Sequence, residues 1–167
     1  MINIRRALPG DWPALWNLLE PVFRAGETYA IDRDISASAA HQLWCTAPLQ
    51  TYIAENPEQE LLGTYLLKPN QGGGGRHVAN AAYVVAESAR GRGVASTLCA
   101  HSQERAHALG FLAMQFNCVV ATNLTAVRLW KRMGFSVVGT LPNAFDHPVH
   151  GLVDAYVMYK SLETVHE

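Results

Sequence analysis

The sequence predicts a single α+β domain with a mixed sheet. Short runs of apolar and β-branched residues alternate with segments whose apolar residues recur at helical spacing. The chain has 167 residues, of which 49% are hydrophobic and 16% charged. This length and composition are sufficient for one domain with a buried core. No repeat and no linker interrupts it. We therefore expect one domain over residues 1–167.

The first part of the chain predicts a strand followed by two helices. Residues 2–7 are expected to form the strand, and Asp11 is expected to cap the first helix. Apolar residues then follow with helical spacing: Trp12, Leu15, Trp16, Leu18, Leu19 and Val22. Residues 26–30 form a loop, and Ser36 or Ser38 caps a second, shorter helix.

The middle of the chain predicts three strands. Residues 50–55 and 61–68 have the composition of strands, and the Asn-Pro-Glu turn between them indicates a hairpin. Residues 70–75 include four consecutive glycines and are expected to form a flexible loop. Residues 77–85 are an apolar run and predict the central strand.

The last part predicts a helix and further strands. We expect a strand over 112–119, a helix over 123–133 capped by Thr122 or Asn123, and a strand over 135–140. Two prolines in residues 141–151 predict a loop. Residues 153–162 predict the final strand.

The central strand leads into a turn that favours anion binding. Gly91 and Gly93 have no Cβ, so an anion can approach the backbone, and Arg90 and Arg92 add positive charge. A helix then begins, and its first N–H groups have no partner within the helix. A Walker A loop would need a Gly-Lys-Ser/Thr ending, and a dinucleotide fingerprint would need glycine where Ser96 stands.

The motif around this turn resembles the pyrophosphate-binding motif of the GNAT superfamily of N-acetyltransferases, which bind acetyl-CoA. It reads Arg90-x-x-Gly93-x-Ala95. A second motif of that superfamily is matched downstream, with tryptophan in place of the usual tyrosine. It reads Asn123-x-x-Ala126-x-x-Leu129-Trp130-x-x-x-Gly134-Phe135. The two motifs in this order are far more specific than either alone, and the resemblance is strongest from residue 77 to 162.

The resemblance implies a mostly antiparallel sheet flanked by helices and splayed between its fourth and fifth strands. Acetyl-CoA would lie in the splay as a cosubstrate, and no metal is implied. The pantetheine arm would pair with backbone groups of the central strand, the pyrophosphate would lie on N–H groups after Arg90, and tryptophan would line the slot near the sulfur. The residues implied for acetyl-CoA are Tyr83, Val84, Val85, Arg90, Gly91, Arg92, Gly93, Val94, Ala95, Ser96, Asn123 and Trp130.

The catalytic residues stay open. In the family a tyrosine at the position of Trp130 is taken to protonate the departing thiolate, whereas an indole N–H can only donate a hydrogen bond to sulfur. A backbone N–H near Val85 would polarise the thioester carbonyl. Residues 77–83 contain no carboxylate to act as a base, which favours amino-acid-like amines or a water-mediated base. The other candidates for a base, which are better explained as residues of a solvated loop, are His147, His150 and Asp154.

A closer similarity suggests the acceptor. The chain resembles the fungal acetyltransferases that detoxify L-azetidine-2-carboxylate, a proline analogue, at His77-x-x-Asn80-Ala81, Phe116-Asn117, Asn123 and Gly151-x-Val153-Asp154. The resemblance implies that Asn80 and Asn117 hold the carboxylate and amine region of the substrate, although each is also readable as a structural amide. Tyr29, in the loop after the first helix, is expected to contact the substrate.

Composition limits the partners. A net charge of −1 argues against nucleic acid, and no apolar run is long enough to span a membrane. An odd number of cysteines, three, and no evident signal peptide favour a cytoplasmic location. We expect an N-acetyltransferase that acts on a small amine, and the chain is a candidate for pairing as a homodimer. The alternatives are an acetyltransferase for protein N-termini or lysines, and a noncatalytic acyl-CoA sensor.

Overall fold

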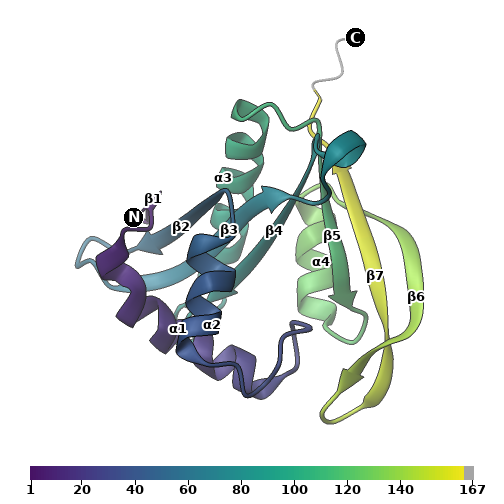
Figure 1. The fold of residues 1–167 in the computed structure, drawn as a ribbon, viewed down its shortest axis with the longest axis horizontal. Coiled ribbons are helices and arrows are strands. Elements are labelled where there is room, and N and C mark those ends of the chain that lie inside the picture. Colours follow the sequence, from purple (N-terminus) through teal and green to yellow (C-terminus); the bar gives the residue numbers. More distant parts are fainter. Residues whose placement is uncertain (164–167) are drawn as a thin grey trace.

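The computed structural model describes residues 1–163 and contains a seven-stranded sheet in the order β1-β2-β3-β4-β5-β7-β6 (Figure 1). The strands are β1 (Asn3–Arg6), β2 (Gln50–Glu55), β3 (Leu61–Pro69), β4 (Val78–Val85), β5 (Ala113–Val120), β6 (Ser136–His147) and β7 (Gly151–Ser161). The α-helices are α1 (Trp12–Ala25), α2 (Ala37–His41), α3 (Val94–Ala108) and α4 (Leu124–Arg132), and a π-helical turn, η2 (Gln42–Thr46), continues α2. Three short 3-10 turns are η1 (Pro9–Asp11), η3 (Gly73–Gly75) and η4 (Glu87–Ala89).

Neighbouring strands are antiparallel except β4 and β5, which are parallel. This pair is joined only at its beginning, where Val78 faces Ala113 and Ala79 faces Met114. Beyond Ala79 the two strands separate, as Figure 1 shows. The mixed, mostly antiparallel sheet and its splay between the fourth and fifth strands are therefore confirmed.

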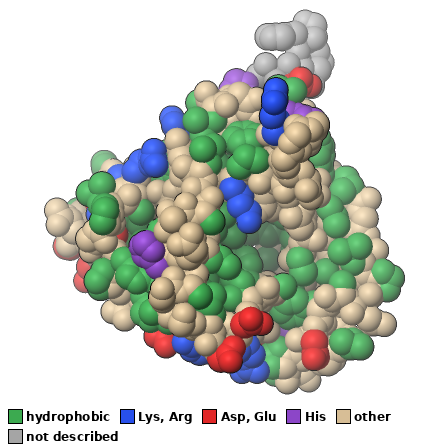
Figure 2. All heavy atoms as spheres, viewed as in Figure 1, with side chains coloured by type: hydrophobic (Ala, Val, Ile, Leu, Met, Phe, Trp, Pro, Cys, Tyr) green, Lys and Arg blue, Asp and Glu red, His purple; other side chains and the backbone are tan. Residues whose placement is uncertain are grey.

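Helices cover both faces of the sheet. α3 and α4 pack on one face, where alternate residues of β4 (Ala79, Ala81 and Tyr83) join the larger core cluster. α1 and α2 pack on the other face with Val84 and Trp44. Seen from the side of α1 and α2, the molecule is hollowed near the centre of the view (Figure 2). Successive side chains of β4 point to opposite faces of the sheet, so alternate residues pack against α3 and α4 on one face and against α1 and α2 on the other.

Local signals explain the helix ends. Ser36 caps α2, because its Oγ accepts the N–H of Ala39 at 3.1 Å. Gly26 ends α1 in the left-handed region at φ 67°. Asp11 precedes α1, but its side chain does not cap that helix. It accepts instead from the Leu8 N–H and from Arg5, so the expected capping role is wrong.

The loop expected over residues 141–151 is also wrong, since β6 continues to His147. The pairing of β6 with β7 breaks between Leu141 and Phe145 and then resumes. Asn143 has φ 50° in this irregular segment, and its N–H is held by Asp154 Oδ1 at 3.0 Å. β6 is the edge strand, where proline is tolerated because one side of the backbone needs no partner.

Within residues 1–163, no helix is long and apolar enough to cross a membrane. The three cysteines at positions 45, 99 and 118 are free thiols.

Candidate active site

The turn between β4 and α3 has a backbone that requires glycine. Gly91 and Gly93 have φ of 72° and 78°, a region that residues with a Cβ rarely adopt. A Cβ built on Gly91 would meet nothing within 4 Å, and one on Gly93 would meet only Ser96 Oγ at 3.8 Å. The space beside both glycines is therefore open, which suits the approach of a ligand to the backbone.

The N-terminus of α3 offers unpaired donors. No side chain caps it, and the hydroxyls of Ser96 and Thr97 donate to the Gly93 carbonyl at 2.9 and 2.8 Å. The N–H groups of Val94, Ala95 and Ser96 precede the first intrahelical hydrogen bond, which Thr97 makes to Gly93. Aligned N–H groups at the positive end of a helix dipole form a site for an anion such as a phosphate.

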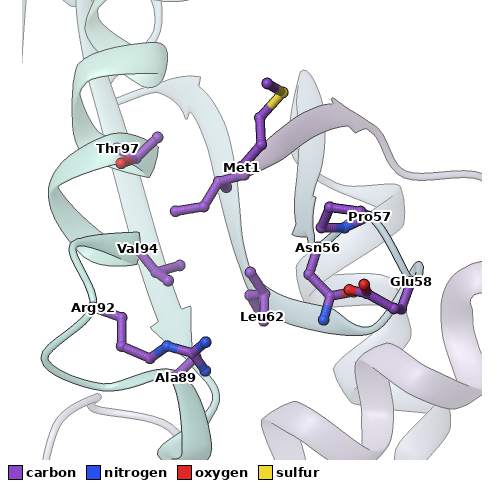
Figure 3. A pocket seen from close by; sticks show the side chains of 10 residues that line it. Met1, Asn56, Pro57, Glu58, Leu62, Ala89, Arg92, Val94 and Thr97 are labelled. Carbon is purple, nitrogen blue, oxygen red and sulfur yellow. The ribbon is translucent and has the colours of Figure 1, made fainter.

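The two arginines of the turn are both exposed. Arg92 directs its side chain into a groove of about 590 Å³ (Figure 3). The groove is lined by Met1, Ile2, Asn56, Pro57, Glu58, Leu62, Ala89, Arg92, Val94 and Thr97. These residues come from the N-terminal segment, the β2–β3 hairpin, the turn between β4 and α3, and the first turn of α3.

Alternate residues of β4 present their peptide groups to the splay. The N–H of Ala86 donates to Leu62 and the carbonyl of Val78 accepts from Asn70, so the even-numbered residues of β4 bond to β3. In an antiparallel pair the residues between them face the other way. The peptide groups of Tyr83 and Val85 therefore point toward the splay, whereas the register of Val84 opposite Thr64 directs its peptide groups to β3.

α4 provides an amide and an indole beside the splay. Asn123 caps α4 through Oδ1, which accepts the N–H of Ala126 at 3.2 Å, and its Nδ2 has no acceptor among residues 1–163. The centroid of the Trp130 ring lies 5.0 Å from the ring centroids of both Tyr83 and Phe116. The indole thus packs where the core meets the opening between β4 and β5.

Three amide side chains, those of Gln115, Asn117 and Asn70, form a hydrogen-bonded chain where β4 and β5 begin to diverge, and Asn80 joins it through the Gln115 backbone. Asn80 Nδ2 donates to the Gln115 carbonyl at 2.9 Å, and the Gln115 side chain donates to Asn117 Oδ1 at 3.0 Å. Asn117 Nδ2 donates in turn to Asn70 Oδ1 at 2.7 Å. Asn80 is partly buried and Asn117 exposed. Sequence reasoning found Asn80 and Asn117 but missed Gln115 and Asn70.

Gln115 was detectable in principle. It lies two residues before Asn117, and alternate residues of a strand share a face. Met114 and Phe116 belong to the core on the α3 side, so Gln115 and Asn117 both face the other side. Asn70 gave no local signal, because it is distant in sequence and follows β3.

Tyr29 enters the splay from the loop between α1 and α2. Its hydroxyl accepts the N–H of Tyr83 at 2.8 Å and donates to the Tyr83 carbonyl at 2.5 Å. Burial of the hydroxyl raises the pKa of Tyr29 to about 12. The phenol is therefore neutral at physiological pH and acts as a hydrogen-bond donor, not as a base.

Two of the other candidates for a base, His147 and Asp154, have structural hydrogen-bond partners, and the His150 ring stacks on that of His147. His147 Nδ1 accepts the backbone N–H groups of Val149 and His150 at 3.1 and 3.2 Å. Asp154 holds the N–H of Asn143, as described above. Residues 1–163 contain no group of three His, Cys, Asp or Glu side chains close enough to hold a metal ion.

Comparison with known proteins agrees with this geometry. The family model described as Acetyltransferase (GNAT) family matches residues 12–135. N-acetyltransferase aca1 of Schizosaccharomyces pombe is 31% identical over 148 residues, which are 79% of this chain and 71% of that protein.

Solved structures share the fold. A GCN5-related N-acetyltransferase from Kribbella flavida superposes with a TM-score of 0.91 at 42% identity, covering 96% of this chain and 97% of that one. A phosphinothricin acetyltransferase from Sinorhizobium meliloti, solved in complex with acetyl-CoA, has a TM-score of 0.85 at 17% identity. The match covers 99% of this chain and 92% of that one, and at this identity it shows the fold alone.

Proposed function

The chain belongs to the acetyltransferase (GNAT) family, and we propose that it transfers the acetyl group of acetyl-CoA to the amine of a small, amino-acid-like molecule. One observation carries the proposal. β4 separates from β5 beyond Ala79, directly before the uncapped N-terminus of α3. This places a backbone edge for the pantetheine arm next to a site for the pyrophosphate.

The residues present fit this ligand. The peptide groups of Val85 face the splay and can bond an extended arm as a neighbouring strand would, while the N–H and carbonyl of Tyr83 are bonded to the Tyr29 hydroxyl. The N–H groups from Gly91 to Ser96 lie around an open glycine turn. Trp130 packs beside the splay and can donate its indole N–H to sulfur. A CoA thiol has a pKa near that of cysteine and leaves readily, so transfer is feasible without a strong acid.

The amide chain supports the choice of acceptor. Nδ2 groups of Asn80 and Asn117 are donors that suit a carboxylate, and the Asn80 carbonyl oxygen suits an amine N–H. Asn80 Nδ2 donates to the Gln115 carbonyl and Asn117 Nδ2 donates to Asn70 Oδ1, so these amides already hold a fixed geometry. An amino acid or proline analogue offers both groups they need. We also propose that the enzyme is cytoplasmic. Its pairing into a homodimer stays a prediction from the sequence.

The test is release of CoA thiol from acetyl-CoA in the presence of a panel of amines. The panel contains proline analogues, amino acids, polyamines, aminoglycosides and peptides with free N-termini. We expect release with amino-acid-like amines and none from the Gly93→Glu variant, which serves as the inactive control. Release with peptides alone would instead make the chain a protein acetyltransferase. Binding of acetyl-CoA with no release for any amine would make it a sensor.

A further inference from the structure

The Tyr29 hydroxyl bonds the two backbone groups of Tyr83 that face the splay and have no partner on β5. It bonds both the N–H and the carbonyl of Tyr83, at 2.8 and 2.5 Å. These are the groups that a neighbouring strand would bond if β5 continued alongside β4. Because β5 has already diverged at this point, the Tyr29 side chain provides the hydrogen-bond partner that the N–H and carbonyl of Tyr83 would otherwise lack.

The fold holds this tyrosine in place. The two ends of its loop are tied by a reciprocal pair of bonds, from Arg24 Nη1 to the Arg33 carbonyl at 2.5 Å and from Arg33 Nε to the Arg24 carbonyl at 2.7 Å. The Tyr29 ring meets the Trp44 ring edge-on at 6.5 Å and packs against the core on the α1 side. The hydroxyl is thus placed by packing and by its loop.

We infer that the Tyr29 hydroxyl occupies the binding position of the acetyl oxygen in the free protein. Its oxygen accepts the Tyr83 N–H, and the acetyl oxygen of acetyl-CoA replaces it there when the ligand binds. This rests on the proposed function, because it needs the thioester to lie along β4. The phenol oxygen and a carbonyl oxygen are alike as acceptors, so the Tyr83 N–H can exchange one for the other. Tyr29 therefore competes with the acyl end of the ligand.

The exchange changes the number of hydrogen bonds in a predictable way. When a carbonyl oxygen arrives, Tyr29 gives up its two bonds to Tyr83 and one bond to the ligand replaces them, so the wild-type protein loses one hydrogen bond there. A protein without the hydroxyl starts with the Tyr83 N–H unpaired and gains a bond. CoA has no acyl oxygen, so it leaves Tyr29 in place and is indifferent to the hydroxyl. Tyr29 would return to Tyr83 once the acetyl group has gone.

The experiment compares affinities for acetyl-CoA and CoA, measured by calorimetry on the wild-type chain and on Tyr29→Phe. The difference of two hydrogen bonds predicts that Tyr29→Phe binds acetyl-CoA at least about fivefold more tightly than the wild type, with CoA affinity unchanged. Tyr52→Phe is the matched control, because it removes a hydroxyl that donates to Gln50 Oε1 at 2.6 Å on β2, a strand that does not pair with β4. It should change neither affinity.

Hydrogen exchange at the Tyr83 amide gives a second measurement. We expect slow exchange in the wild type, faster exchange in Tyr29→Phe, and slow exchange again in that variant with acetyl-CoA but not with CoA. Equal or weaker acetyl-CoA binding by Tyr29→Phe, or an unchanged exchange rate, would overturn the inference while leaving the proposed function intact. Failure of both proteins to bind acetyl-CoA would overturn the proposed function and the inference with it.

Discussion

Substitution of Gly93 separates the geometry of the anion site from its chemistry. Gly93 has φ 78°, and a residue with a Cβ pays about 1–2 kcal/mol to adopt this region. Its Cβ would meet only Ser96 Oγ at 3.8 Å, so alanine causes no clash. Gly93→Ala should therefore lower the free energy of unfolding by about 1–2 kcal/mol and leave most of the acetyl-CoA affinity.

Gly93→Glu carries the same backbone strain and adds a carboxylate where the pyrophosphate is expected. Two unit charges about 4 Å apart repel by about 1 kcal/mol in water and by about 4 kcal/mol at an effective dielectric constant of 20. The side chain also fills the open space beside the turn. We expect the affinity for acetyl-CoA to fall at least a hundredfold relative to Gly93→Ala, a loss of about 2.8 kcal/mol or more.

Chemical denaturation measures the strain and calorimetry measures the affinity. If both variants unfold with similar free energies and bind acetyl-CoA equally well, the pyrophosphate does not lie at the N-terminus of α3. If Gly93→Ala alone already abolishes binding while folded, the loss follows from backbone conformation and the electrostatic reasoning fails.

Three further predictions concern the acceptor, the acid and the fold. Asn117→Ala should raise the acceptor KM about two- to tenfold, as expected for one lost hydrogen bond, with acetyl-CoA affinity kept; equal losses of both would indicate a structural role. Trp130→Tyr should raise kcat by up to about a hundredfold, and an unchanged kcat would show that proton delivery does not limit turnover. Arg5 donates to Asp11 and holds the pKa of that carboxyl below its usual value of 3.8. Stability from this pair is present above that pH and is lost as the pH falls through the lowered pKa. Asp11→Asn should therefore cost about 1 kcal/mol at pH 7 and progressively less below pH 4 in urea titrations; a cost independent of pH would contradict the ion pair.

Much of the fold was predictable because its signals are local. Asn123 and Gly134 lie at the two ends of α4, where capping and a left-handed backbone are read from single residues. The glycine turn before α3 was recognisable for the same reason. The splay of β4 from β5 was not local, and only the resemblance to a known family predicted it.

What the sequence could not predict depends on distant partners. β6 was expected to end near residue 140, since the prolines that follow are typical of loops, yet pairing with β7 carries it to His147. Tyr29 was expected near the substrate, but nothing in its neighbourhood indicates a bond to the Tyr83 peptide. The contact of Asn117 with Asn70 likewise joins segments far apart in the chain.

A structure of the chain crystallised with acetyl-CoA tests the central claim most directly. We predict electron density for the pyrophosphate within hydrogen-bonding distance of backbone N–H groups between Gly91 and Ser96, with the pantetheine arm alongside Tyr83 and Val85. Density for the pyrophosphate away from the N–H groups of residues 91–96 would contradict the account.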